Sequence, residues 1–162
     1  MKTTRKTLFI LCIVSLLVAG FAAAQTTDNK DNSELVLAME DDGQLMDVAD
    51  AIAETGTDDL VATISKGVTI FAPVDGSFGK EVVIEDVITE YIVPVLLDSE
   101  DMVTDATFTS MGGTPVAVTI YDEEVMVNGI PIVDLEGIHS GNVVIYKLAD
   151  SFDSTPVAFT GK

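Results

Sequence analysis

The sequence has few residues that could stabilise a core through disulfides or bound metal. Its 162 residues contain one cysteine, Cys12, and one histidine, His139. Cys12 lies in an amino-terminal apolar run that we expect to be removed, which would leave a mature chain without a thiol. That absence excludes disulfides, thiolate metal ligands and a cysteine nucleophile. The fold must therefore rely on packing.

Basic residues are scarce as well. The chain has eight lysines and arginines against 27 aspartates and glutamates, and a formal net charge of −19. Such a surface argues against nucleic acid as a partner and disfavours anionic membranes, because phosphate binding needs clustered Lys and Arg. It favours solubility and weak association with cations.

Sequence motifs of catalysis and modification are missing too. We find no phosphate-binding loop, dinucleotide fingerprint, zinc spacing or nucleophile elbow. The sequon Asn-x-Ser/Thr is absent, so N-glycosylation is not expected. The sequence therefore predicts no catalytic residue, no metal site and no cofactor.

Residues 1–24 have the pattern of a secretory signal peptide. Lys2, Arg5 and Lys6 form a basic start, residues 8–18 are almost wholly apolar, and residues 22–24 are alanines. This order predicts cleavage after residue 24 and a secreted, extracellular or periplasmic product. The alternative is a retained membrane anchor, but the apolar run is shorter than the about 20 residues that span a bilayer.

The mature chain would have 138 residues, enough for one domain with one core. It would keep five of the eight basic residues and all 27 acidic ones, which gives a net charge of −22. We expect a leader or linker over residues 25–42, a folded domain over residues 43–152 and a tail over residues 153–162. No stable membrane insertion is expected after cleavage.

The first half of the domain is expected to be helical. Apolar spacing predicts a helix over residues 45–54 with Gly56 as its C-cap. Residues 58–59 are aspartates that can open a second short helix. The same spacing predicts a third helix over residues 82–91, which ends before Pro94.

Residues 68–78 form the central stretch of the chain. Residues 68–72 alternate as in a β-strand on a pleated surface, and Pro73 stops the ladder by removing a backbone donor. Asp75-Gly76-Ser77 are residues that favour a turn and a helix cap, and Phe78 is again apolar. The pattern predicts a core strand that runs into a tight capped turn.

From residue 106 the apolar period changes to two, which is typical of strands. The expected strands cover residues 106–110, 116–121, 124–127, 130–133 and 143–148. Asn128-Gly129 is the strongest hairpin signal, because it suits a turn with positive φ at both positions. Residues 137–142 are expected to be a loop. Helices followed by a strand meander predict an α+β fold.

The expected core is made of apolar side chains from these elements. It comprises Ile70, Phe71, Phe78, Val87, Tyr91, Val118, Ile120, Val127, Ile132, Val144 and Leu148.

Four motifs in order resemble those of the fasciclin domain family. Val68 to Phe78 resembles the first signature, aliphatic-Phe-Ala-Pro followed by polar residues and Phe. Tyr91 to Pro94 resembles the Tyr-His-aliphatic-aliphatic-Pro motif, and Val127-Asn128-Gly129 the aliphatic-Asn-Gly hairpin. Asn142 to Leu148 is similar to the closing signature. Order and spacing fit over residues 43–152.

The resemblance implies one α+β domain, with amino-terminal helices packed on a mainly antiparallel, β-sandwich-like wedge. It also implies a non-catalytic binding module for adhesion or recognition at a cell surface or in a matrix. The implied partner is a protein, a glycan or another copy of the domain. The chain departs from the family pattern at Ile92 and Tyr146, where histidines are usual, and at Ala149, where aspartate is usual.

Tyr91-Ile92-Val93-Pro94 is the candidate partner-binding segment, since the resemblance associates its tyrosine with partner binding in some family members. Residues 95–97 are also apolar, so nearly the whole stretch of residues 91–97 is apolar. It is either an exposed adhesive patch or core packing that compensates for a shortened helix. We favour the core, because an exposed patch of this size would promote aggregation.

The alternative function is a small secreted hydrolase that uses acidic turns, with or without calcium. A catalytic triad would combine His139 with Ser140 and Asp134, but adjacent residues rarely face each other productively. Acidic turns at residues 40–42, 98–101 and 122–124 offer oxygen ligands. They lack the alternating spacing and central glycine of a calcium loop. A solvated loop histidine and solvated acidic turns are therefore the favoured interpretations.

Overall fold

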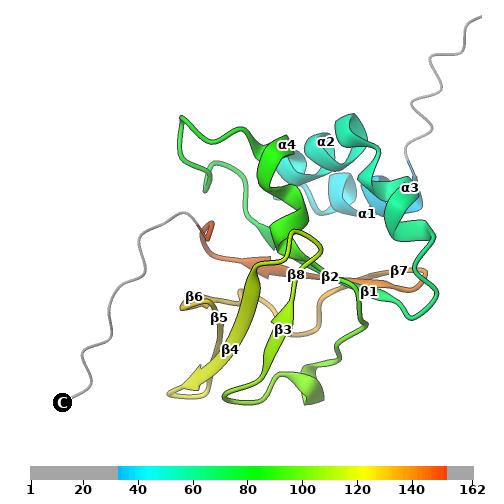
Figure 1. Cartoon of the computed structure of the whole chain (residues 1–162). Coiled ribbons are helices and arrows are strands. Elements are labelled where there is room, and N and C mark those ends of the chain that lie inside the picture. Colours follow the sequence, from blue (N-terminus) through cyan, green and yellow to red (C-terminus); the bar gives the residue numbers. More distant parts are fainter. Residues whose placement is uncertain (1–32, 153–162) are drawn as a thin grey trace, which may run out of the picture. The chain divides into compact units, whose positions relative to one another are not determined.

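The computed structural model describes residues 33–152 (Figure 1). They form the expected α+β fold, with helices in the first part and two four-stranded sheets. No helix in this range is long and apolar enough to cross a membrane. The predicted signal peptide, leader residues 25–32 and the tail 153–162 lie outside the described residues.

Three helices precede the first strand: α1 (Glu34–Asp42), α2 (Met46–Thr55) and α3 (Thr57–Ala62). The glycines that follow α1 and α2, Gly43 and Gly56, have φ of +72° and +66°. This left-handed conformation closes a helix carboxyl end, and glycine adopts it without a side-chain clash. The predicted helices at residues 45–54 and from residue 58 are confirmed, as is the cap at Gly56.

The prediction of a leader through residue 42 is wrong for residues 34–42, because these residues form α1. The Ser33 hydroxyl accepts a hydrogen bond from the Val36 N–H at 3.4 Å and caps the helix. Leu35, Val36 and Met39 are buried in the core. The helix is short and weakly amphipathic, so it depends on tertiary packing as well as on its caps.

The first sheet has the strand order β2-β1-β8-β7. β1 (Val68–Pro73) runs parallel to β8 (Val143–Leu148) and antiparallel to β2 (Ile92–Val93). All six residues of β1 are buried. The predicted core strand is confirmed: the helices cover one face of β1 and the second sheet covers the other (Figure 1).

The other edge of this sheet is β7 (Ile138–Ser140), which pairs with β8 in an antiparallel register. The prediction of a loop over residues 137–142 is wrong for these three residues. A strand this short has no periodic signal of its own, and its conformation depends on the hydrogen bonds that β8 supplies.

The second sheet is an antiparallel meander in the order β3-β4-β5-β6. Its strands are β3 (Thr107–Thr109), β4 (Pro115–Tyr121), β5 (Glu124–Val127) and β6 (Ile130–Pro131). The predicted hairpin at Asn128-Gly129 is confirmed, with φ of +51° and +83°. β6 is shorter than predicted, because Ile132 leaves it to pair with Leu148 of the first sheet.

The predicted helix over residues 82–91 is only partly present. α4 (Ile84–Val87) covers four residues, and the 3-10 turn η2 (Ile88–Tyr91) follows it directly. Val83 lies before α4 and is 54% exposed. The tighter turn directs Ile88 and Tyr91 into the interior, and a continuous helix is not formed.

Two apolar clusters make up the interior, one between the helices and the first sheet and one between the two sheets. The expected core residues that are buried are Ile70, Phe71, Tyr91, Val118, Val127, Ile132, Val144 and Leu148. Phe78 and Val87 are partly buried against these clusters. The prediction for Ile120 is wrong: it is 40% exposed, because it lies near the end of β4, beyond the part of the sheet that is covered.

The turn after β1 is attached to the start of α2. Asp75 Oδ1 accepts the Asp47 N–H at 2.9 Å, and Asp47 Oδ2 accepts the Gly76 N–H at 2.9 Å. The N-cap residue Leu45 has no side chain that can accept such a bond. Asp75 therefore does for α2 what an N-cap side chain normally does.

Candidate functional site

The candidate partner-binding segment lies mostly inside the domain. Tyr91, Ile92 and Val93 are at most 1% exposed, whereas Pro94 is exposed. Ile92 and Val93 form β2 and pair with Ile70 and Thr69 of β1. Their burial favours the core interpretation, and partner binding by this segment stays a prediction.

Tyr91 holds Phe152, the last described residue, against the interior of the domain. Its ring stacks on the Phe152 ring at a centroid distance of 4.3 Å and an interplanar angle of 9°, and Phe78 contacts it edge-on at 5.6 Å. The Tyr91 hydroxyl accepts the Phe152 N–H at 2.9 Å. Phe152 packs against the same cluster. Tyr91 therefore fixes the carboxyl end of the described chain.

A concave site of about 700 Å³ lies elsewhere, between η3 (Ser99–Asp101) and the chain around residues 134–139. We call it the acidic groove. Its lining consists of Asp98, Ser99, Glu100, Asp134, Leu135, Glu136, His139 and Tyr146.

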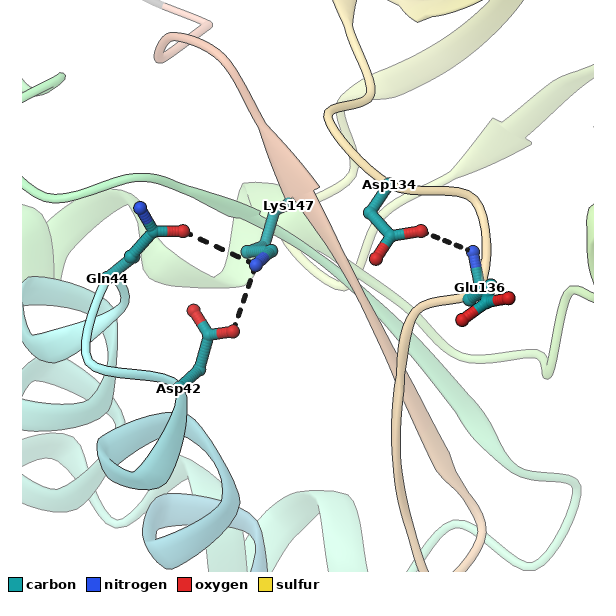
Figure 2. A network of polar contacts seen from close by, with 5 residues as sticks. All are labelled: Asp42, Gln44, Asp134, Glu136 and Lys147. Atoms are coloured by element: carbon teal, nitrogen blue, oxygen red, sulfur yellow. Dashed lines mark hydrogen bonds and ion pairs between the residues drawn. The ribbon is translucent and has the colours of Figure 1, made fainter.

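Both acidic walls of the groove are ordered by local hydrogen bonds. The Asp98 N–H donates to Asp101 Oδ2 at 3.0 Å within a capping box that starts η3. The Glu136 N–H donates to Asp134 Oδ1 at 2.9 Å (Figure 2). Carboxylates on both walls can bind a cationic group.

Tyr146 contributes a buried phenol to the groove. Its hydroxyl donates to the Leu97 carbonyl oxygen at 2.9 Å, and its ring stacks on Phe71. Burial raises the pKa of Tyr146 above 10.0, and the nearby charges of Asp98 and Asp101 raise it further. Both effects oppose formation of the phenolate.

The residues of the suggested triad are not hydrogen-bonded to one another in the described part of the chain. His139 Nε2 lies 3.2 Å from the Glu136 carbonyl oxygen, and Asp134 is bonded to the Glu136 N–H. Ser140 is buried at 6% exposure, on the same short strand as exposed His139. This geometry gives no support to a hydrolase.

Nor do the described residues bring three or more potential metal ligands together. The acidic turn at residues 40–42 has a structural contact instead: Asp42 Oδ2 lies 2.9 Å from Lys147 Nζ, which also donates to Gln44 Oε1 at 3.4 Å (Figure 2). Lys147 and Asp42 are 15% and 17% exposed. This ion pair links the end of α1 to β8.

The acidic groove was not found from the sequence. The acidic turn at residues 98–101 was noticed, but residues 134–136 lie far along the chain, and no local signal indicates that the two face each other. The pairing of β1 with β8, and of β8 with β7, brings them together. Only the three-dimensional fold reveals the site.

Comparison with known proteins agrees with the motifs. The Fasciclin domain family model matches residues 43–151. No curated protein matches the chain.

We expect Tyr91→Ala to lower the free energy of unfolding by about 3 kcal/mol or more, because it leaves a cavity between Phe78 and Phe152. Urea unfolding measures this change. The matched control is Tyr91→Phe, which keeps the ring stack and removes the hydroxyl that accepts the Phe152 N–H, at a cost of about 1 kcal/mol. Unchanged stability of Tyr91→Ala with lost partner binding or self-association would make Tyr91 a contact residue.

Stability should also fall at alkaline pH through Tyr146. The pKa of Tyr146 is higher in the folded state than the unfolded value of 10.0. The contribution of Tyr146 to the free energy of unfolding is therefore complete below pH 10.0 and is lost as pH rises through the folded-state pKa. Tyr146→Phe cannot titrate, and its urea midpoint should decline less between about pH 9 and about pH 11 than that of the wild type. All other groups are the same in the two proteins, so parallel declines would contradict the role of Tyr146.

Proposed function

The chain belongs to the fasciclin domain family, and we propose that it is an exported, non-catalytic module for adhesion or recognition at a cell surface or in a matrix. Fasciclin domains are known as adhesion and recognition modules, are generally non-catalytic and are typically extracellular or at the cell surface. The observation that carries the proposal is the family match over residues 43–151, which covers most of the described domain.

Charge supports a cationic partner. Residues 33–152 contain three lysines and no arginine, and all but three of the 27 acidic residues lie in the same range, which leaves 24 carboxylates. A potential of this sign attracts basic surfaces and repels phosphate-rich ones. The partner we propose is therefore a cell-surface or matrix protein, or a glycan with cationic groups.

Only one residue of the segment from Tyr91 to Pro94 is available to a partner. Pro94 is the exposed member, and the three residues before it support it from the interior. A partner that contacts this segment in the folded domain would meet Pro94 and the half-buried Val95 rather than the Tyr91 ring.

Export has a direct test. Protein purified from the medium or envelope of its native host should have the intact mass of a chain that begins at Gln25, because signal peptidase cleaves after small residues. A mature protein that still carries residues 1–24 would exclude cleavage and favour the anchored alternative.

Recognition can be tested with the domain of residues 25–162 immobilised on a surface. Native host cells or their matrix should bind it saturably, and binding should weaken as salt is raised, because exposed charges are screened. A chain of the same composition with scrambled order is the control for unspecific charge binding. Equal capture by the domain and the scrambled chain would refute a recognition module.

A further inference from the structure

Asn128 contacts a third strand besides the two that its turn connects. It is the first residue of the two-residue turn between β5 and β6, with φ of +51°, and Gly129 follows with φ of +83°. The register of β4 and β5 pairs Val118 with Val127, and one step further it places Ala117 opposite Asn128. Asn128 therefore lies where the pairing of β5 with β4 meets the turn into β6.

The Asn128 side chain takes the place of its own backbone carbonyl in this pairing. The Asn128 N–H donates to the Ala117 carbonyl oxygen at 2.8 Å, and the Ala117 N–H donates to Asn128 Oδ1 at 2.8 Å. In a hydrogen-bonded antiparallel pair, the second bond normally goes to a backbone carbonyl. Asn128 Nδ2 also donates to the Pro115 carbonyl oxygen at 3.3 Å. Both polar atoms of the amide are thus held by β4.

Asn-Gly is also the sequence in which the backbone most easily attacks an asparagine side chain. The Gly129 nitrogen forms a bond to Asn128 Cγ, and the side-chain amide leaves as ammonia, which takes up the proton of that nitrogen. Water then opens the five-membered imide ring and leaves either aspartate or isoaspartate. In isoaspartate the chain continues through the side-chain carbonyl. Glycine permits the attack because it has no side chain to obstruct it.

The sequence places this reactivity at one asparagine. The chain has four asparagines, and those other than Asn128 precede lysine, serine and valine. Each of these residues has a side chain that hinders attack by its own backbone nitrogen. Gly129 is exposed to solvent, so the water that opens the ring has access. Asn128 is therefore the asparagine from which the unfolded chain loses ammonia most easily.

The folded structure opposes the reaction. For ring closure Cγ must rotate onto the Gly129 nitrogen, and this rotation withdraws the side-chain amide from the two groups of β4 that it bonds. The Ala117 N–H then loses its acceptor in a half-buried strand, which raises the free energy of that state. The reaction is therefore confined to molecules in which this end of the β4–β5 pairing has opened.

We propose that Asn128 is a site of covalent modification by spontaneous deamidation, and that local opening of β4 from the β5–β6 turn sets its rate. The proposal goes beyond the recognition function and does not depend on it. The bonds to β4 keep the asparagine intact while the sheet is closed, and each opening exposes it to attack by its own backbone. The amount of modified protein increases with the time that this end of the sheet spends open.

The two products differ in how well the turn accepts them. Aspartate keeps an oxygen for the Ala117 N–H but has no N–H to donate to the Pro115 carbonyl oxygen. Isoaspartate adds one carbon to the backbone of a two-residue turn, so the pairing of Val127 with Ile130 cannot keep its register. The isoaspartyl protein, separated by chromatography, should therefore unfold at a lower urea concentration than the Asn128→Asp variant. Equal urea midpoints would contradict this consequence.

The test compares three samples in one mildly alkaline buffer: the folded protein, the protein unfolded in urea, and a peptide of residues 123–133. Peptide mapping by mass spectrometry follows the conversion of Asn128 to the acid. The folded protein should react at least about tenfold more slowly than the other two, because only its open fraction reacts. Deuterium exchange of the Ala117 N–H, followed by NMR, measures the same opening independently.

Two matched variants separate local opening from global unfolding. Val127→Ala removes a fully buried side chain beside the turn, and Val61→Ala removes the same group from α3, where it is 1% exposed. Val127→Ala should accelerate both deamidation and Ala117 exchange by about tenfold, whereas Val61→Ala should change each rate by less than about twofold. The wild-type comparison decides the question even if Val127→Ala does not fold.

Three results would overturn the proposal. The first is deamidation of the folded protein as fast as that of the peptide, which would show that the bonds to β4 give no protection. The second is loss of ammonia from the urea-unfolded chain at another asparagine before Asn128. The third is equal acceleration by Val127→Ala and Val61→Ala, which would make global unfolding the controlling step.

Discussion

The pairing of β1 with β8 is the interaction on which the rest of the structure depends. The two strands run in parallel register from Val68 opposite Val143 to Pro73 opposite Leu148, and both apolar clusters share them. Buried Thr69 is satisfied within this layer, since its hydroxyl donates to the Val95 carbonyl oxygen at 2.8 Å and accepts the Leu97 N–H at 2.9 Å. Without disulfides, burial of apolar area on the two faces is the main source of stability.

Two of the three departures from the family pattern, Ile92 and Tyr146, lie close to this strand pair. Ile92 pairs with Ile70 and is fully buried, and Tyr146 stacks on Phe71 and bonds to the Leu97 carbonyl oxygen. An imidazole at either position would bring a group that titrates near neutral pH into the interior. The substitutions replace that chemistry with apolar packing and with a phenol that stays protonated over the physiological range.

Local signals in the sequence predicted the helices at residues 45–54 and from residue 58, the Asn128-Gly129 turn and most strands, because caps, turns and periodicity act over a few residues. Features that depend on distant partners were missed. α1 and β7 are short and owe their conformation to neighbours, and complete burial of Thr69 requires a partner 26 residues away. The exposure of Ile120 could not be predicted, since periodicity shows which face a residue is on and not where the covering layer ends. The acidic groove was missed because its two walls are distant in the sequence and no local signal brings them together.

The Tyr91–Phe152 contact also has a mechanical consequence under the adhesion function proposed above. Tension applied beyond Phe152 reaches the ring stack and the bond to the Tyr91 hydroxyl first. It then reaches the Ser151 hydroxyl bond to the Ser77 carbonyl oxygen and the Ala149 N–H bond to the Pro131 carbonyl oxygen. Only after these yield does the load reach β8. There it acts along a parallel strand pair, where the hydrogen bonds resist together in shear. The Tyr91–Phe152 contact should therefore break at a lower force than the β1–β8 strand pair behind it.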